Sequence, residues 1–137
     1  MNVIRPVLLA LLLSVNSVHA AMQNPYALVF FFDSTCAYCH RLAPKVQQAS
    51  LDFALPIYAF SINGQGIPGF EVPIPVTHDI ATTFFPQTTQ PVMPATFLLN
   101  VNSRKFAKLS IGDVAQRQLN QSIQQVLNDL TLQKALQ

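Results

Sequence analysis

Two cysteines, Cys36 and Cys39, are the residues of this sequence whose type and spacing most clearly indicate chemistry. The chain has no other cysteine, so each is the other's only possible intramolecular disulfide partner. A bridge across such a short gap restrains the unfolded chain very little, because the entropic benefit of a disulfide grows with the length of the loop that it closes. The pair therefore favours a redox or nucleophilic function over a purely structural one.

The sequence around the pair predicts where it lies in the fold. Residues 27–32 form a short, unbroken apolar and aromatic run, which is typical of a strand buried on both faces. Residues 33–35, Asp-Ser-Thr, offer side chains that can cap a helix. From residue 36 to about residue 50 apolar side chains recur at three- and four-residue spacing, which predicts an amphipathic helix that Pro44 should kink. Both thiols should therefore lie at a strand-to-helix junction.

A cysteine in the first turn of a helix is well placed to react as a thiolate. Free N–H groups and the positive end of the helix dipole stabilise negative charge there, so Cys36 is the expected nucleophile. Cys39 lies one turn further in and should face the buried side. From there its thiol can attack a mixed disulfide on Cys36 and release the substrate. Tyr38 lies between the two cysteines, where we expect it to be exposed and able to contact a substrate peptide.

The remaining sequence predicts a mixed α/β sandwich that begins with parallel strands and closes with an antiparallel hairpin. The expected strands cover residues 56–61, 95–99 and 105–110, the expected helices cover residues 78–85 and 114–132, and residues 62–77 should form a long ordered loop. The last helix should be capped by Gly112 and Asp113 and should pack through Leu119, Ile123, Val126, Leu127 and Leu130.

The first 20 residues have the features of a removable secretion signal. Arg5 gives a short positive start, residues 6–15 are apolar and rich in Leu, and residues 18–20 fit the small-x-small pattern of a cleavage site. The apolar run is shorter than the ~20 residues that span a bilayer, although an uncleaved anchor remains the alternative. We expect cleavage after Ala20, a single domain over residues 21–137 without stable membrane insertion, and the periplasm as its location in a Gram-negative source.

The composition excludes nucleic acid as a partner. Half of the 137 residues are hydrophobic and only 10% are charged, and the formal net charge is +2. One of those positive charges, on Arg5, belongs to the predicted signal. Nucleic-acid binding requires a basic field that this chain does not have. We therefore expect the partners to be proteins.

The segment from Phe31 to Leu42, Phe-Phe-Asp-Ser-Thr-Cys-Ala-Tyr-Cys-His-Arg-Leu, resembles the active-site segment of thioredoxin-fold disulfide isomerases of the DsbC type. Pro44 matches the helix-kinking proline of that fold, and Met93 and Pro94 occupy the place of its cis-proline loop, which lies against the cysteines. Phe30 stands where thioredoxin itself carries a buried acid. The resemblance implies a thioredoxin-like fold, with a central mixed sheet flanked by helices.

Further motifs are similar to the TrbB type of periplasmic thiol-disulfide isomerase from F-type conjugative transfer systems; they cover residues 63–66, 72–75, 84–86 and 96–102. This resemblance implies an enzyme that folds disulfide-containing proteins of the conjugation and pilus-assembly apparatus. It implies a periplasmic thiol electron donor as a second partner, and neither a cofactor nor a metal. The site residues that it implies are Cys36 and Cys39 as the catalytic pair and Tyr38, Met93 and Pro94 as substrate contacts.

Two other uses of the cysteines remain open. Cys-x-x-Cys-His over residues 36–40 is also the attachment pattern of c-type haem, with Met93 as a conceivable distal ligand. Haem proteins of that type and size are mainly helical, and the predicted strands disfavour them. Zinc held by both cysteines, His40 and His78 is disfavoured because His40 follows Cys39 directly and should point elsewhere on the helix.

Three functional questions also stay open at the level of sequence. The protein could be an isomerase, a disulfide oxidase, or a non-enzymatic thioredoxin-fold interaction module of the transfer apparatus whose disulfide is permanently closed. Intact Cys36 and Cys39 favour an enzyme, but the redox direction does not follow from the residues. His40 is either an ordinary polar residue of the first helical turn or a group that tunes the thiolate.

Overall fold

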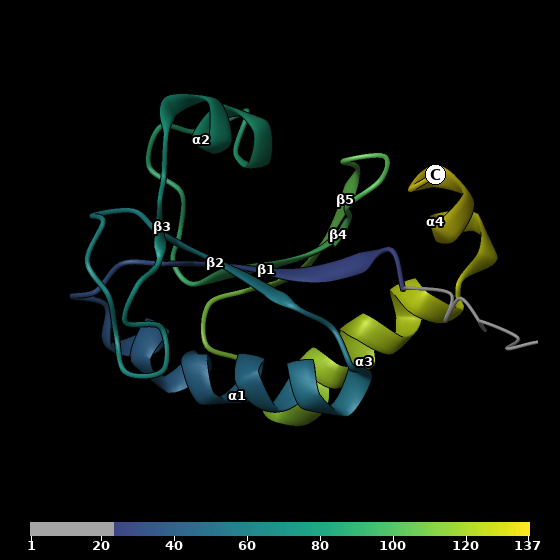
Figure 1. The fold of residues 1–137 in the computed structure, drawn as a ribbon, viewed down its shortest axis with the longest axis horizontal. Helices are drawn as coiled ribbons and strands as arrows, with labels where there is room; N and C mark the ends of the chain where they lie inside the picture. The colour runs from purple at the N-terminus through teal and green to yellow at the C-terminus, as the bar shows by residue number, and fades with distance from the viewer. Residues whose placement is uncertain (1–23) are drawn as a thin grey trace, which may run out of the picture.

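The computed structural model describes residues 24–137, so the predicted signal over residues 1–20 lies outside the described residues. Figure 1 shows the elements in the order β1 (Tyr26–Phe32), α1 (Ala37–Phe53), β2 (Ile57–Ser61), β3 (Ile74–Pro75), α2 (His78–Phe84), β4 (Ala95–Asn100), β5 (Phe106–Ile111), α3 (Gln116–Asn128) and α4 (Leu130–Ala135). None of the helices in this part of the chain is both long and apolar enough to cross a membrane.

The strands form one mixed sheet in the order β3-β2-β1-β4-β5. β1 lies in the middle, parallel to β2 and antiparallel to β4, and β4 pairs with β5 in the predicted antiparallel hairpin. All seven residues of β1 are buried. The unbroken apolar run therefore forms the central strand, as the sequence predicts.

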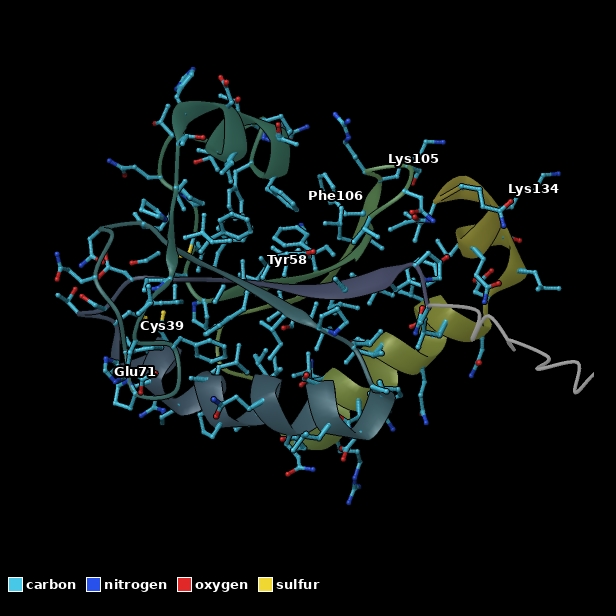
Figure 2. The ribbon with its side chains drawn as sticks, in the orientation of Figure 1. Cys39, Tyr58, Glu71, Lys105, Phe106 and Lys134 are labelled. Atoms are coloured by element: carbon cyan, nitrogen blue, oxygen red, sulfur yellow. The ribbon has the colours of Figure 1, made fainter. Side chains whose placement is uncertain are left out.

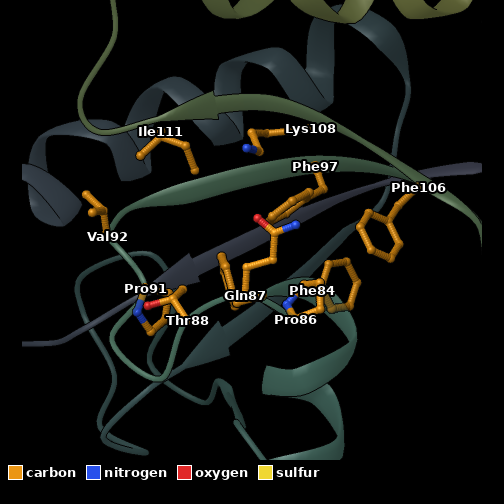
Figure 3. Close-up of a pocket in the computed structure, with 11 residues that line it drawn as sticks. Phe84, Pro86, Gln87, Thr88, Pro91, Val92, Phe97, Phe106, Lys108 and Ile111 are labelled. Atoms are coloured by element: carbon orange, nitrogen blue, oxygen red, sulfur yellow. The ribbon is translucent and has the colours of Figure 1, made fainter.

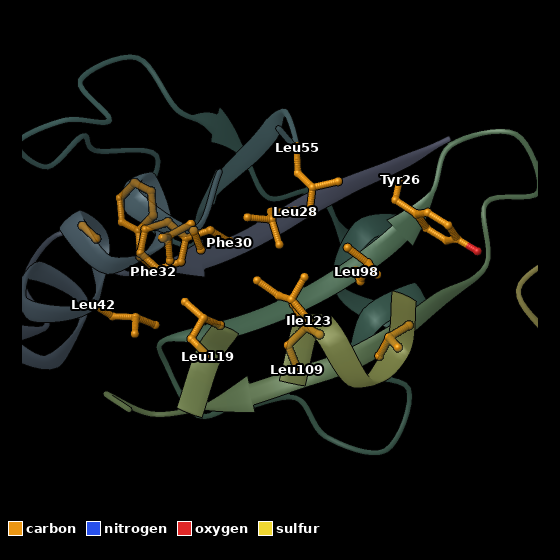
Figure 4. Packing of buried hydrophobic residues seen from close by; sticks show 14 of the residues in the cluster. Tyr26, Leu28, Phe30, Phe32, Leu42, Leu55, Leu98, Leu109, Leu119 and Ile123 are labelled. Atoms are coloured by element: carbon orange, nitrogen blue, oxygen red, sulfur yellow. The ribbon is translucent and has the colours of Figure 1, made fainter. Parts of the chain in front are cut away.

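Helices cover the two faces of this sheet unequally. α1 and α3 lie together on one face and the short α2 lies on the other (Figure 1). Leu28, Phe30 and Phe32 point toward α1 and α3, where they join a core that Figure 4 shows from close by. Val29 and Phe31 point the opposite way, toward α2. Side chains alternate along a strand, so a strand between two apolar layers must be apolar at every position.

The predicted loop over residues 62–77 is wrong in one respect, because it contains the short strand β3. Ile74 and Pro75 pair with Phe60 and Ser61 of β2 at the edge of the sheet. An edge strand tolerates proline where the N–H that proline lacks would point to solvent and would not pair with another strand. Two residues are too few to show the alternating pattern by which a strand is predicted.

The single C-terminal helix predicted over residues 114–132 is also wrong. The helix breaks at Asp129, which is the C-cap of α3 and the N-cap of α4, and its carboxylate accepts hydrogen bonds from the N–H groups of Thr131 and Leu132. Leu119, Ile123 and Val126 are buried as predicted. Leu130 lies beyond the break and is 79% exposed.

Asp113 does not cap the last helix as predicted, because its carboxylate is used elsewhere. It accepts hydrogen bonds from Lys45 at 2.6 Å and from Arg41 at 3.2 Å, both on α1. The hydrogen bond from Lys45 holds the pKa of Asp113 below its usual value. The N-cap of α3 is Ala115, which has no side-chain capping bond. Asp113 instead fastens the β5–α3 loop to the helix that carries the cysteines.

The break at Asp129 gives a matched test of the core. Leu119→Ala should lower the free energy of unfolding by about 2–5 kcal/mol, because it empties a buried site. Leu130→Ala makes the same chemical change at an exposed site and should alter it by less than about 0.5 kcal/mol. Urea denaturation of both variants measures the difference. Equal losses would show that the last helix packs as the sequence predicts and not as the structure has it.

Candidate functional site

Cys36 itself is the N-cap of α1. Its backbone is extended, and its Sγ accepts a hydrogen bond from the Cys39 N–H at 3.2 Å. Its carbonyl accepts from the N–H groups of Cys39 and His40, at 3.1 and 3.2 Å. The sulfur therefore occupies the position where a capping oxygen normally lies, and it shares the Cys39 N–H with the Cys36 carbonyl. An N–H that points at the sulfur stabilises negative charge on it.

The prediction that residues 33–35 cap this helix is wrong because the Asp33 carboxylate is already engaged. Its Oδ1 accepts from the N–H of Thr35 at 2.8 Å and from the Thr35 hydroxyl at 2.7 Å. These hydrogen bonds hold the pKa of Asp33 below its usual value, and the one from the Thr35 hydroxyl has the larger effect. The result is a tight turn that ends β1 and delivers Cys36 to the start of α1.

Asn63 holds this turn from the neighbouring loop, and although residues 63–66 are one of the motifs of the resemblance, the sequence does not predict this contact. Its Nδ2 donates to the Ser34 hydroxyl at 2.8 Å and to Asp33 Oδ1 at 3.4 Å, and its Oδ1 accepts from the Ser34 N–H at 3.4 Å. The same oxygen accepts from the Ser61 hydroxyl at the end of β2. The available signals are the Asn-Gly pair after a strand, which predicts a turn, and the resemblance over residues 63–66; neither predicts a contact with another loop.

Cys39 lies directly behind Cys36 and is fully buried in the core between α1 and the sheet, below the sheet in Figure 2. Cys36 is only partly buried. Burial, and after it the hydrogen bond with Cys36, raises the pKa of the Cys39 thiol to about 12. The buried Phe30 belongs to the same core. The two thiols therefore differ sharply in access, and the buried Cys39 thiol is hard to ionise.

The Met93–Pro94 segment lies against Cys36, as the resemblance implies. The peptide bond between the two residues is cis, and the Met93 carbonyl is 3.8 Å from Cys36 Sγ, which donates to it. Pro94 is buried. Its carbonyl accepts from the Gly112 N–H at 2.7 Å, and Gly112 has a φ of 82°, which favours glycine. The segment is thus fixed to the end of β5.

Tyr38 and His40 complete the first turn of α1. Tyr38 is 57% exposed, and the Arg41 guanidinium lies 4.5 Å from its ring centre. His40 Nε2 is 2.7 Å from the Ser34 carbonyl, so the ring reaches back over the turn before Cys36. An Nε2–H that donates to this carbonyl would add a further tie between the turn and the helix.

The structure bears on both metal-centred alternatives. A small c-type haem protein should be mainly helical, whereas this chain is built on a five-stranded sheet. The zinc alternative needs His78 beside the cysteines, but His78 begins α2 on the other face of the sheet. Residues 24–137 contain no group of three or more Cys, His, Asp or Glu side chains that could hold a metal ion.

The chain matches a known protein family over most of its length. The family model described as "TraF: F plasmid transfer operon protein" matches residues 15–124. Protein TrbB of Escherichia coli strain K12 is 35% identical over 88 residues, which cover 64% of this chain and 48% of that protein. The chain therefore spans about half the length of the curated relative that it matches.

Solved structures with a similar fold are thioredoxin-like. The putative thiol:disulfide interchange protein DsbE from Chlorobium tepidum has a TM-score of 0.53 and 17% identity, with 74% of this chain and 79% of that chain covered. A thioredoxin-related protein from Neisseria meningitidis serogroup B has a TM-score of 0.51 and 15% identity, with 80% and 90% covered. At such low identity the likeness concerns the fold, and it confirms the predicted thioredoxin-like α/β architecture.

The unequal thiols predict selective alkylation. Iodoacetamide should modify Cys36 of the reduced, folded protein from pH 7 to pH 9, while Cys39 stays unmodified because its thiol is buried and its pKa is raised to about 12. Peptide mass mapping identifies the modified residue, and denatured protein, in which both should react, is the control. Cys36→Ala should be almost inert when folded and Cys39→Ala fully reactive. Equal labelling of both residues in the folded protein would contradict the assignment.

Proposed function

Because the chain belongs to the TraF family of F plasmid transfer operon proteins, we propose that it is a periplasmic thiol-disulfide oxidoreductase that works through Cys36 and Cys39. One observation carries this proposal. The partly exposed Cys36 sulfur caps α1 beside the Met93 carbonyl, and the second thiol is buried directly behind it. This is the arrangement that nucleophilic attack followed by intramolecular resolution requires.

The exchange begins at Cys36. Its thiolate attacks one sulfur of a substrate disulfide, the S–S bond breaks, and the other substrate sulfur leaves as a thiolate. The product is a mixed disulfide between Cys36 and the substrate. The Cys39 N–H, which donates to the Cys36 sulfur at 3.2 Å, stabilises the negative charge before the attack. The Met93 carbonyl is in reach of an N–H from an extended substrate chain, which would align the substrate as an added strand.

Two outcomes are open to the mixed disulfide. If Cys39 loses its proton to the substrate thiolate and attacks the Cys36 sulfur, a Cys36–Cys39 bond forms and the substrate leaves reduced by two electrons. If the substrate thiolate instead attacks another disulfide of the same substrate, a different thiolate can displace Cys36, and the substrate is rearranged without net oxidation or reduction. The raised pKa of Cys39 slows the first route, because the buried thiol must ionise before it attacks. Together with the resemblance of residues 31–42 to disulfide isomerases of the DsbC type, this leads us to infer that the protein acts as an isomerase.

We further propose that the substrates are disulfide-containing proteins of the conjugation and pilus-assembly apparatus. The family match and the TrbB relative support this, and the predicted signal supports the periplasm as the compartment. A periplasmic thiol donor would keep the pair reduced. Tyr38, Met93 and Pro94 are the proposed substrate contacts, because Tyr38 is exposed in the first turn of α1, the Met93 carbonyl contacts Cys36 Sγ, and Pro94 follows Met93 across the cis bond.

The division of labour between the cysteines is tested by trapping. In Cys39→Ala the mixed disulfide on Cys36 cannot be resolved from within the protein, so substrate proteins should stay covalently attached. Cys36→Ala should trap nothing, because Cys39 is buried. Both variants are expressed in the periplasm of cells that carry the transfer system and compared on non-reducing gels, with the double variant as the background. Equal trapping by the two single variants would overturn the assignment.

The proposed isomerase activity is tested against oxidation. The reduced protein should restore activity to scrambled ribonuclease faster than the disulfide form oxidises reduced ribonuclease, because a free Cys36 thiolate is needed to attack a wrong disulfide. In acid-quenched cells most of the pair should be alkylated as dithiol. A pair found almost wholly disulfide-bonded, with no gain on the scrambled substrate, would reassign the protein as an oxidase. No reaction in either assay would favour a non-enzymatic binding module.

A further inference from the structure

The face of the sheet that α2 covers carries an open apolar groove of about 460 Å³. α2 has seven residues, whereas the opposite face is covered by helices of 17 and 13 residues, so part of this aromatic face stays uncovered. Figure 3 shows the groove between α2 and its following loop on one side and β5 on the other; its lining includes Phe84, Phe97 and Phe106 from the floor, and Val92, Lys108 and Ile111 from the rim.

The floor of the groove is a rigid aromatic surface. The Phe84 and Phe106 rings are stacked with their centres 4.3 Å apart, and Phe97 meets both edge-on at 5.1 and 5.5 Å. Phe97 is buried, while the other two are partly exposed. Rings that already pack against one another lose little freedom when a ligand covers them, so the surface is preformed for an apolar side chain.

One end of the groove is next to the proposed reaction site along the chain. Val92 directly precedes Met93, whose carbonyl contacts Cys36 Sγ, and Ile111 pairs with Ala95, directly after Pro94. From there the rim follows β5 to Phe106, which pairs with Leu99. Ala95 to Leu99 is a rise of about 13 Å along a strand. A chain held at Cys36 could therefore continue into the groove for about four extended residues without a turn.

One positive charge lies in the lining of the groove. Lys108 is the charged residue of its lining and lies beside Phe97 in the β4–β5 ladder. No acidic side chain among residues 24–137 forms an ion pair with Lys108. A ligand that places a carboxylate there would gain an interaction that the protein does not supply to itself. Lys108 pairs with Phe97, which is four residues beyond Met93. A substrate carboxylate that reaches Lys108 should therefore lie about four extended residues from the sulfur that reacts with Cys36.

We propose that this groove binds the substrate polypeptide next to its reacting cysteine, and that it selects an extended segment with apolar side chains and an acidic residue about four positions from that cysteine. The inference rests on the proposed function, since the substrate must be held at Cys36. The substrate class belongs to the same site, and Lys108 is its specificity-determining residue.

The test uses Cys39→Ala protein and peptides whose single cysteine is activated as a mixed disulfide with thionitrobenzoate. Attack by Cys36 releases thionitrobenzoate, and its absorbance gives the rate. One peptide carries Leu and Phe together with Asp four positions from the cysteine, a second has Lys in place of the Asp, and a third has Ser in place of Leu and Phe. Each is made with the cysteine at either end. Activated cysteine amide, which is too short to reach the groove, reports on Cys36 alone.

The Asp peptide should react roughly threefold faster than the Lys peptide in at least one chain direction, as expected for one exposed charge pair. The Ser peptide should be slower than the Asp peptide. Adding Lys108→Glu should reverse the preference between Asp and Lys and leave the rate with cysteine amide unchanged. Lys134→Glu, which makes the same charge change on α4 outside the groove, is the matched control and should preserve the preference.

Three results would overturn the inference. The first is that the preference for the Asp peptide over the Lys peptide stays unchanged in Lys108→Glu. The second is that Lys134→Glu also reverses this preference. The third is a dimer in sedimentation experiments that Lys108→Glu dissociates, since the groove would then be covered by a second copy of the chain. Failure of the proposed function looks different, because cysteine amide would also fail to react.

Discussion

The contact on which the site depends is the hydrogen bond from the Cys39 N–H to the Cys36 sulfur. It makes one atom both the cap of a 17-residue helix and the proposed nucleophile. The first N–H groups of a helix have no partner further along it, and the Cys36 sulfur and carbonyl together accept from the Cys39 N–H. A sulfur placed there is held in a fixed position and is stabilised when it carries negative charge. Fold stability and proposed reactivity therefore share one constraint.

Other parts of the chain serve to keep that sulfur in place. The Asp33–Thr35 turn delivers it from the central strand, and Asn63 ties the turn to the end of β2. Asp113 links α1 to the loop after β5, while Gly112 holds the Pro94 carbonyl. These ties come from loops far apart in the sequence. The mixed sheet brings them together at the end of the strands where β1 stops and α1 begins.

The elements that the sequence predicts correctly are those whose structure is determined by a local pattern. The apolar run of β1, the amphipathic α1 and the β4–β5 hairpin were predicted because periodicity and composition suffice for them. The resemblance added the position of Met93 and Pro94 beside Cys36, which no local pattern contains. The fold class was predicted in full, and the strand order agrees with it.

The errors occur where side chains had a choice of partner. Asp33 and Asp113 were both expected to cap helices, but Asp33 bonds to Thr35 and Asp113 pairs with Lys45. The break at Asp129 depends on which N–H groups its carboxylate accepts from. The groove beside Lys108 arises from packing between α2 and β5, so the sequence of neither element alone predicts it. Such features depend on tertiary contacts and not on the period of a sequence.

The central claim is that Cys36 and Cys39 form one redox couple, and equilibrium titration in thiol-disulfide buffers tests it directly. The fraction of dithiol, counted by alkylation and mass spectrometry, should follow a single reversible two-electron transition, with a tenfold change in the dithiol-to-disulfide ratio for about 30 mV. Cys36→Ala and Cys39→Ala should show no such transition. A wild-type pair that stays dithiol or stays disulfide across the whole range, while the protein remains folded, would contradict the account.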